Sequence, residues 1–221
     1  MRQSGLMWLV CVAIGLLSAE GVFAGPTELQ TLIRGVEHRY NAARTLSVSF
    51  TETYRIAGHE RSPESGRLVL RKPGRMRWTY AQPEGKLFIS DGKEVYLYTS
   101  QDNRVEKSTL KASDDLRAPM AFLLGKLDLK KEFREFETHG GTGGTWLEGK
   151  AANDRLPYER VAMLIAPDYS IRELKITGRD ESVLDFTFSD ETVNPKVSDD
   201  LFAFAIPDGA EVVNAVNTGE N

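Results

Sequence analysis

The sequence contains few of the residues that build disulfide frameworks and metal sites. Its 221 residues include a single cysteine and three histidines. One cysteine cannot form an internal disulfide, and His38, His59 and His139 do not fall in a metal-ligand spacing. We therefore expect a protein stabilised by its hydrophobic core alone, with no cofactor and no metal, and with these histidines at the surface.

Long hydrophobic runs are also scarce, and the one that is present lies at the N-terminus. Residues 5–17 are apolar and follow Arg2, a pattern that is typical of a secretory signal peptide and too short for a transmembrane helix. Val22 and Ala24 provide small side chains at the −3 and −1 positions of a cleavage site. We predict a signal peptide over residues 1–24 and a location in the periplasm.

A retained membrane anchor and lipidation at Cys11 are the alternatives to this cleavage. Val10 is branched where a lipoprotein signal has a small residue, and Cys11 lies inside the hydrophobic run, so we favour cleavage. The remaining residues, 25–221, then contain no cysteine. We expect them to form one domain and a monomer, with a loose polar tail over residues 214–221.

An excess of positive charge is absent as well. The chain has 28 Lys and Arg against 32 Asp and Glu, a formal net charge of −4. Residues 1–24 contribute one charge of each sign, so the balance does not change on cleavage. Nucleic-acid-binding domains are usually strongly basic, and we expect no nucleic-acid partner.

Catalytic motifs are incomplete. Residues 144–150 match the first seven positions of a phosphate-binding loop, but Ala151 replaces the hydroxyl residue that binds magnesium, and no helix follows. His139 and the two glycines after it are similar to an esterase oxyanion loop, but the chain has no G-x-S-x-G motif. We predict no enzymatic activity. An exported hydrolase stays an alternative, because the members of a catalytic triad need not be close in sequence.

What the chain does contain is a clear change of hydrophobic period. Thr27 to Gln30 form a capping box, and apolar residues follow at helical spacing. They are Leu29, Leu32, Ile33, Val36, Tyr40 and Ala43. The spacing predicts an amphipathic helix over residues 27–44 whose apolar face covers another part of the protein.

From residue 46 onward the period is two, which predicts strands. The expected strands cover residues 46–56, 67–72, 75–80, 86–89, 94–98, 131–137, 145–150, 158–165, 171–177, 183–189 and 204–213, and short helical pieces cover 114–125 and 198–202. Tight-turn signals such as Asp91-Gly92 favour antiparallel pairing. A sheet of ten or eleven strands must curl, so we predict a mainly β protein with its helices on one side of a curled sheet.

The stretch 71–80 has two different faces. Met76, Trp78 and Tyr80 alternate with polar residues, so a strand here has one aromatic face and one cationic face. By the same parity, Leu68 and Leu70 share a face of the preceding strand. The aromatic face either fills a core or stays open for an apolar ligand.

The cationic side of this stretch is the basic run Arg71, Lys72, Arg75 and Arg77. Such a run is most often a solvated sheet face or a set of salt-bridge partners. A docking surface for an acidic partner or for anionic lipid head groups is the functional alternative, and Arg75 and Arg77 are the candidates for it.

The order of these features resembles the outer-membrane lipoprotein carrier family (LolA-type). Residues 66–80, GRLVLRKPGRMRWTY, are similar to its signature of a Gly, alternating apolar residues, a basic residue before Pro and a Trp shortly after. Pro83 with residues 89–98 resembles the next block, residues 119–125 the middle helix, and residues 202–212 the closing segment. The resemblance covers essentially all of residues 25–221.

This resemblance implies an unclosed antiparallel β-barrel, LolA/LolB-like, with a helical lid over its concave face. Members bind the acyl chains of lipoproteins and carry them across the periplasm without covalent chemistry. They accept cargo from an inner-membrane lipoprotein-releasing ABC transporter and deliver it to an outer-membrane receptor lipoprotein. Alternatives within the same fold are a carrier of another lipid or glycolipid, or a sensor of such molecules.

The resemblance also implies which residues form the site. The candidate acyl-chain contacts are Leu68, Leu70, Met76, Trp78, Tyr80, Ile89, Leu97, Met120, Phe122 and Leu123, and the candidate lid residues are Leu29, Leu32, Ile33 and Val36. In the family, a basic residue before the signature proline latches the lid, and here that residue is Lys72. The alternative is that Lys72 lies at a strand end and points to water.

Overall fold

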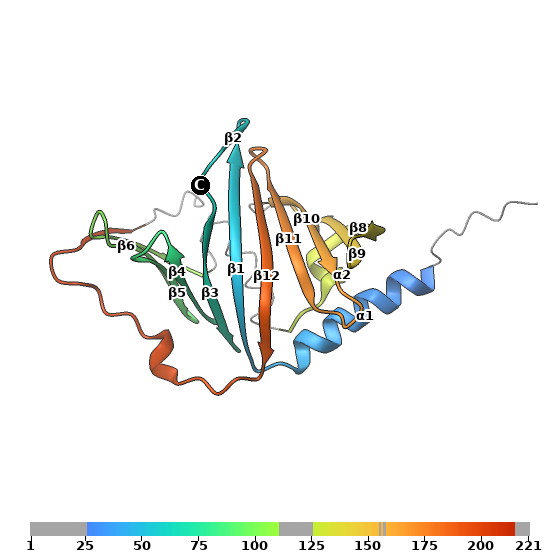
Figure 1. Cartoon of the computed structure of the whole chain (residues 1–221), viewed down its shortest axis with the longest axis horizontal. Helices are drawn as coiled ribbons and strands as arrows, with labels where there is room; N and C mark the ends of the chain where they lie inside the picture. Colours follow the sequence, from blue (N-terminus) through green and yellow to red (C-terminus); the bar gives the residue numbers. More distant parts are fainter. Residues whose placement is uncertain (1–25, 111–125, 155, 157, 215–221) are drawn as a thin grey trace, which may run out of the picture.

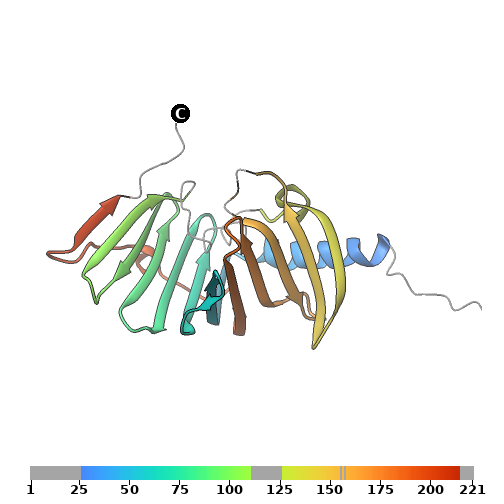
Figure 2. The same cartoon turned by 90° about the horizontal axis from the view of Figure 1, so that it is seen from above.

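One large sheet dominates the molecule (Figure 1). The computed structural model describes residues 26–110, 126–154, 156 and 158–214. The described residues form a 13-stranded sheet in the order β13-β7-β6-β5-β4-β3-β1-β12-β11-β10-β9-β8, with β2 paired to β1. Strands β13 and β8 lie at opposite ends of the molecule, so the sheet does not close (Figure 2). The predicted fold, an unclosed β-barrel with few helices, is confirmed.

The elements follow the predicted order closely. They are α1 (Pro26–Ala42), β1 (Thr45–Ile56), β2 (His59–Glu60), β3 (Glu64–Arg71), β4 (Arg75–Gln82), β5 (Lys86–Asp91), β6 (Glu94–Thr99), β7 (Arg104–Thr109), α2 (Leu129–Glu132), β8 (Phe133–Gly141), β9 (Gly144–Ala151), β10 (Tyr158–Ile165), β11 (Ile171–Gly178), β12 (Val183–Val193), η2 (Asp199–Phe202) and β13 (Glu211–Asn214). The helix expected over residues 27–44 is α1.

The strand prediction is wrong in three respects. Strands β2 and β7 are additional, because their short polar sequences show no period-two apolar pattern. The last strand is four residues long and pairs parallel to β7, in place of a long antiparallel edge strand. Asn214 belongs to this strand and pairs with Lys107, so the predicted loose tail does not include it.

The face of the sheet that carries Leu68, Trp78 and Phe186 is called the inner face below. Antiparallel pairing places Leu68 opposite Trp78 and Leu70 opposite Met76, so these four side chains point to the same side. Helix α1 packs on this side through Ile33 and Val36, which belong to the same buried cluster. The parity predicted from the sequence for β3 and β4 is thus confirmed.

The segment between β12 and β13 covers the other face of β4 and β5, the outer face. It leaves the end of β12 and runs to the far edge of the sheet (Figure 1). Within it, η2 lies against β4 and β5, and Phe204 packs on Tyr96 with ring centroids 5.2 Å apart. Ile89, on the outer side of β5, is therefore buried as well.

Several predicted features lie outside the described residues. These are the signal peptide over residues 1–24, most of the predicted tail and the helical piece over residues 114–125. None of the described helices has the length and apolar character needed to cross a bilayer.

Candidate functional site

Aromatic side chains from strands β4, β1 and β12 meet on the inner face, across the intervening strand β3. Phe50 of β1 makes edge contacts with Trp78 and Tyr80 of β4, at centroid distances of 4.8 and 5.2 Å. Trp78 also approaches Phe186 of β12 at 5.4 Å and is fully buried. Such edge-to-face contacts favour a fixed arrangement of the rings. The inner face therefore has a hydrocarbon surface of defined shape at its centre.

The strand register places most of the predicted acyl-chain contacts on this face. Leu68, Leu70, Met76, Trp78 and Tyr80 are all buried members of its cluster. Leu97 lies opposite Phe88 in the β5–β6 pair, and Phe88 lies opposite Trp78, so Leu97 belongs to the inner face too. Met120, Phe122 and Leu123 lie outside the described residues.

Ile89 is the exception, because the structure places it on the outer face. It pairs with Arg77 and Tyr96, both of which point away from Trp78. It is nevertheless almost completely buried, since the C-terminal segment covers this side of β5. The inner-face residue at this point is its neighbour Phe88.

A group of charged residues lies at the end of the inner face where β3 begins. Tyr80 donates a hydrogen bond to Glu52 at 3.2 Å, and Glu52 is only 3% exposed. Lys86 pairs with Glu64 and places its ammonium group 4.5 Å from the centre of the Tyr80 ring. These contacts compensate charges that would otherwise be costly on an apolar surface.

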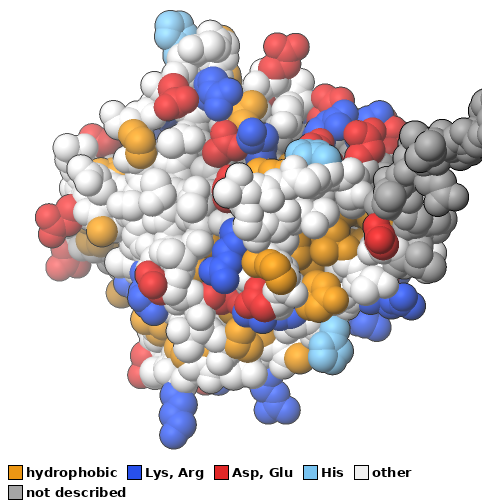
Figure 3. Space-filling model, turned by 45° about the vertical axis from the view of Figure 1, so that its right-hand side comes forward, with side chains coloured by type: hydrophobic (Ala, Val, Ile, Leu, Met, Phe, Trp, Pro, Cys, Tyr) orange, Lys and Arg blue, Asp and Glu red, His pale blue; other side chains and the backbone are white. Residues whose placement is uncertain are grey.

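Helix α1 supplies the predicted lid residues. Ile33 and Val36 are buried, whereas Leu29 and Leu32 are half-buried and line a cavity of about 420 Å³. This cavity lies beside β8, β9 and the β10–β11 turn, where Tyr169 forms part of its wall. Figure 3, which brings this side forward, shows a group of hydrophobic side chains exposed among charged ones. The N-terminal half of α1 is thus less tightly packed than its C-terminal half.

Lys72 contacts the helix, as the latch prediction requires. Its Nζ atom donates a hydrogen bond of 2.6 Å to the backbone oxygen of Tyr40. Burial lowers the pKa of this amine, and the carbonyl at the helix end favours a cation beside it. The alternative, in which Lys72 points to water, is wrong for its ammonium group.

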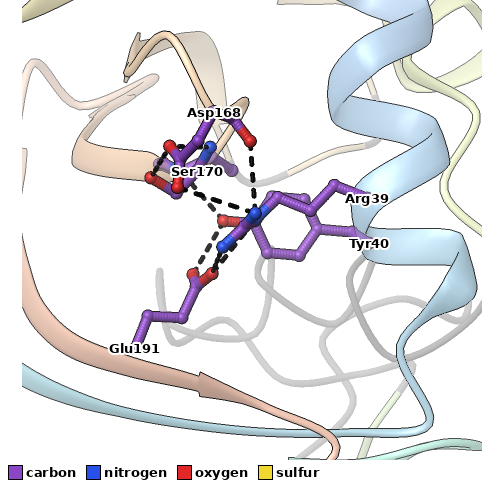
Figure 4. Close-up of polar contacts among 6 residues, drawn as sticks. Arg39, Tyr40, Asp168, Ser170 and Glu191 are labelled. Carbon is purple, nitrogen blue, oxygen red and sulfur yellow. Dashed lines mark hydrogen bonds and ion pairs between the residues drawn. The ribbon is translucent and has the colours of Figure 1, made fainter.

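The side chains of Arg39 and Tyr40 fasten the same end of α1 to the other half of the sheet (Figure 4). Arg39 donates to Glu191 Oε1 at 3.1 Å from Nε and at 2.5 Å from a terminal nitrogen, and it also reaches the Asp168 carbonyl at 3.1 Å. Tyr40 donates to Glu191 Oε2 at 2.9 Å and accepts from the Ile171 amide at 2.8 Å.

Burial and neighbouring groups shift the pKa values of Tyr40 and Asp168 in this network. Burial, together with the Glu191 carboxylate, raises the pKa of Tyr40 far above its usual value, so the hydroxyl remains a donor. A hydrogen bond from Ser170 lowers the pKa of Asp168, which stays charged beside Arg39. Tyr40 is thus bound through its carbonyl to Lys72 and through its hydroxyl to Glu191.

The basic run on the outer face is a set of partners for the C-terminal segment. Arg75 and Arg71 both pair with Asp199, at 2.9 and 2.7 Å. Arg77 donates to the Leu201 carbonyl at 3.0 Å. The salt-bridge interpretation is confirmed for Arg71 and Arg75, whereas Arg77 binds a backbone carbonyl and Lys72 contacts the helix. Arg75 and Arg77 are therefore occupied rather than free for a docking partner.

A cluster of metal-binding side chains is absent from the described part of the chain. This part holds no group of three or more His, Asp and Glu residues that could bind a metal ion. His38, His59 and His139 are exposed, as predicted. His139 contacts Glu148 at 3.0 Å, and this hydrogen bond raises the pKa of the imidazole.

Five residues of this region were not predicted from the sequence: Tyr40 as a fastening point, Phe50, Phe88, Phe186 and Glu191. The alternation of β1 and β12 marks Phe50 and Phe186 as inward-facing once the parity of β4 is known. Phe88 cannot be separated from Ile89 by pattern, since both are apolar neighbours. The contact of Glu191 with Tyr40 has no local signal, because the two residues are 151 positions apart.

Comparison with known proteins agrees with this geometry. Residues 41–205 match the family model described as outer membrane lipoprotein carrier protein LolA. An outer-membrane lipoprotein carrier protein of Nitrosomonas europaea is 26% identical over 213 residues, covering 94% of this chain and 98% of the relative. One of Cupriavidus necator is 27% identical over 206 residues, covering 92% and 95%.

Among solved structures, an uncharacterized conserved protein from Thermus thermophilus has a similar fold. Its TM-score is 0.51 at 15% identity, and the match covers 84% of this chain and 98% of that one. The family model spans most of the chain and includes the strands that form the inner face. The chain therefore belongs to the LolA family of outer-membrane lipoprotein carrier proteins.

Proposed function

We propose that this protein binds the acyl chains of lipoproteins between its inner face and α1, and carries them through the periplasm to the outer membrane. The observation that carries the proposal is that an apolar helix face lies on an apolar sheet face, with Lys72 of the sheet side donating a hydrogen bond to the Tyr40 carbonyl at the end of the helix. Such a bond holds the lid on the face without sealing it permanently.

Magnitudes explain why a carrier needs this lid. Each buried CH₂ group contributes roughly 0.8 kcal/mol, so a sixteen-carbon chain offers about 10 kcal/mol before costs. Several chains bound on a bare face would be difficult to release. When cargo must first displace Ile33 and Val36 from the inner face, the observed affinity falls by the free energy of opening.

The partners follow from the same proposal. Cargo reaches the carrier from an inner-membrane lipoprotein-releasing ABC transporter, and an outer-membrane receptor lipoprotein accepts it. The carrier supplies binding and release and makes no covalent change to the cargo. Met76 suits varied acyl chains, because thioether side chains adapt their shape.

A charge on the inner face tests the proposal. The protein without residues 1–24 is titrated with a fluorescent fatty acyl probe, and Met76→Glu and Leu97→Glu are expected to weaken binding at least tenfold, because a carboxylate beside hydrocarbon is poorly solvated. Leu97 is half-buried, so its variant keeps the test valid if Met76→Glu fails to fold. Thr79→Glu places the same charge on the outer face of β4 and is the control.

Equal probe binding by the parent protein and all three variants would contradict the assignment of the inner face.

The cargo itself is tested by purifying the protein from its own periplasm and identifying bound material by mass spectrometry. Acylated lipoproteins are expected. Another lipid class would replace lipoproteins as cargo, and lipid-free protein from repeated preparations would argue against a carrier.

A further inference from the structure

We propose that a second site, outside the inner face, binds a phosphate group. It is a cavity of about 810 Å³ at the end of the sheet where α1 stops, β1 begins and β3 ends. Its walls are formed by Ala42, Arg44, Thr45, Arg71, Lys72, Pro73, Lys126, Asn194, Pro195, Lys196 and Val197. Five of these described residues are Lys or Arg and none is Asp or Glu, although the whole chain has a net charge of −4.

Other contacts account for two of the five cations. Lys72 is bound to the Tyr40 carbonyl, and Arg71 is held by Asp199 and by the Val197 carbonyl at 3.0 Å. The side chains of Arg44, Lys126 and Lys196 make no ion pair or hydrogen bond with any other described residue. Three cations thus remain available in one cavity, and their common sign favours an anion as the ligand.

The frame of the cavity is fixed by hydrogen bonds across three segments. The Arg44 amide donates to the Asn194 side chain at 2.8 Å, and the Lys72 amide donates to the Arg44 carbonyl at 2.9 Å. Thr45 Oγ1 donates to the Pro195 carbonyl at 2.8 Å, and the Asn194 amide donates to the Thr45 carbonyl at 2.9 Å. The backbone positions of Arg44 and of the 194–196 segment are therefore set before a ligand arrives.

A phosphate group suits this arrangement better than a single carboxylate. It presents several acceptor oxygens in different directions, and each can take a charge-assisted hydrogen bond from a separate Lys or Arg. The apolar walls at Ala42, Pro73 and Val197 suit the carbon atoms next to it. The phosphate comes either from a lipid head group, with its acyl chains on the inner face, or from a free phosphate ion.

If the phosphate belongs to a lipid head group, the inference rests on the proposed acyl-chain binding. If it is a free phosphate ion, the inference is independent of that proposal. The probes are therefore dihexanoyl phosphatidic acid, dihexanoylglycerol and inorganic phosphate, titrated calorimetrically into the protein without residues 1–24. The two lipids have the same acyl chains and differ only in the phosphate. We expect phosphatidic acid to bind about tenfold more tightly than the diacylglycerol, from two or three partly exposed ion pairs.

The double variant Arg44→Gln with Lys196→Gln tests the residues. It is expected to bring the two lipids to within about twofold of each other. Lys93→Gln with Arg172→Gln removes two exposed cations elsewhere and is expected to keep the difference.

The outcomes separate the two sources and the two proposals. A phosphate preference that the double variant abolishes supports the site, with a lipid head group as the source if only phosphatidic acid binds. Inorganic phosphate that binds to the parent protein and not to the double variant supports a free ion, even if neither lipid binds and acyl-chain carriage fails. Equal binding of both lipids with no binding of phosphate overturns this inference and leaves acyl-chain carriage intact.

Discussion

At the scale of single residues, the molecule depends on what each polar side chain does beside hydrocarbon. Lys72 is placed by β3 next to an apolar face, and its ammonium group is satisfied by one helix carbonyl. Lysine has a flexible side chain and lacks the planar guanidinium group of arginine. It can therefore bind one carbonyl oxygen without needing a second acceptor. A hydrogen bond of this kind contributes about 1 kcal/mol, so under the proposed function it biases the helix toward the sheet and still breaks when cargo binds.

Lys72→Leu is expected to raise the affinity for an acyl probe by about two- to tenfold, because the net free energy of one hydrogen bond no longer opposes opening. Release to an acceptor should slow by a similar factor. Lys72→Arg keeps a donor at this position and should bind like the parent protein. Fluorescence titration of the three proteins measures the effect, and unchanged or weaker binding by the leucine variant would contradict the latch.

At the scale of elements, α1 is held to the sheet far more firmly at one end than along its length. Its C-terminal turn carries the Arg39 and Tyr40 contacts to Glu191, while Leu29 and Leu32 at the other end border a cavity. Glu191 is mostly buried and accepts from both side chains. Its carboxylate is therefore the group on which the fastening of the helix depends.

Glu191→Gln should lower the free energy of unfolding by about 2 kcal/mol, because it removes a buried acceptor and leaves the Arg39 guanidinium with a weaker partner. Amide exchange in the last turns of α1 should become faster. The matched control is Asp185→Asn, since Asp185 pairs with Arg55 and Lys175 at the surface, where ion pairs contribute less than about 1 kcal/mol. Urea unfolding compares the two, and equal losses would refute the special role of Glu191.

A strand could be predicted from the sequence wherever one of its faces is apolar and the other is polar. The alternation of Met76, Trp78 and Tyr80 with charged residues indicates both the strand and its inward face, and the register confirms it. The same logic fails at Phe88 and Ile89, because the C-terminal segment buries the outer face of β5 and both positions are apolar. The short strands β2 and β13 have no pattern of their own and form only because a neighbour offers an edge.

The candidate site was partly predictable for a similar reason. The signature before Pro73 indicates a cation at the latch, but its acceptor is a backbone carbonyl, which has no sequence identity. Glu191 and the cavity formed by Arg44, Lys126 and Lys196 depend on segments that meet only in the folded chain. Charge runs close in sequence, such as Arg75 and Arg77, suggested a docking surface, and they bind the chain's own C-terminal segment instead.

At the scale of the whole molecule, the sheet is shielded on two sides by different segments. Helix α1 covers the inner face, and the segment from β12 to β13 covers the outer face of β4 and β5. Phe202 is buried in the second contact, whereas Trp78 is buried on the inner face against Phe50 and Phe186. We therefore expect a substitution on the outer face to change stability alone, and a substitution on the inner face to change both stability and ligand binding.

Phe202→Ala should lower the free energy of unfolding by about 3 kcal/mol, the usual cost of removing a buried aromatic side chain, and should leave acyl binding per folded molecule unchanged. Trp78→Ala should cost a similar amount of stability and also weaken acyl binding. Thermal unfolding and probe titration on both variants make the comparison. If Phe202→Ala impaired acyl binding as much as Trp78→Ala, the two faces would not be independent.

The hydrogen bonds of the Arg39 and Tyr40 side chains to Glu191 make the C-terminal end of α1 a fulcrum. Leu29 lies about 16 Å from Tyr40 along the axis, at a rise of 1.5 Å per residue. A swing of about 20° about this fulcrum moves the tip of the lever arm by about 6 Å, more than the separation of two carbon atoms in contact. In the proposed carrier, once the Lys72 bond has broken, a small rotation at the fixed end admits a hydrocarbon chain at the free end while the Tyr40 hydroxyl stays bound to Glu191.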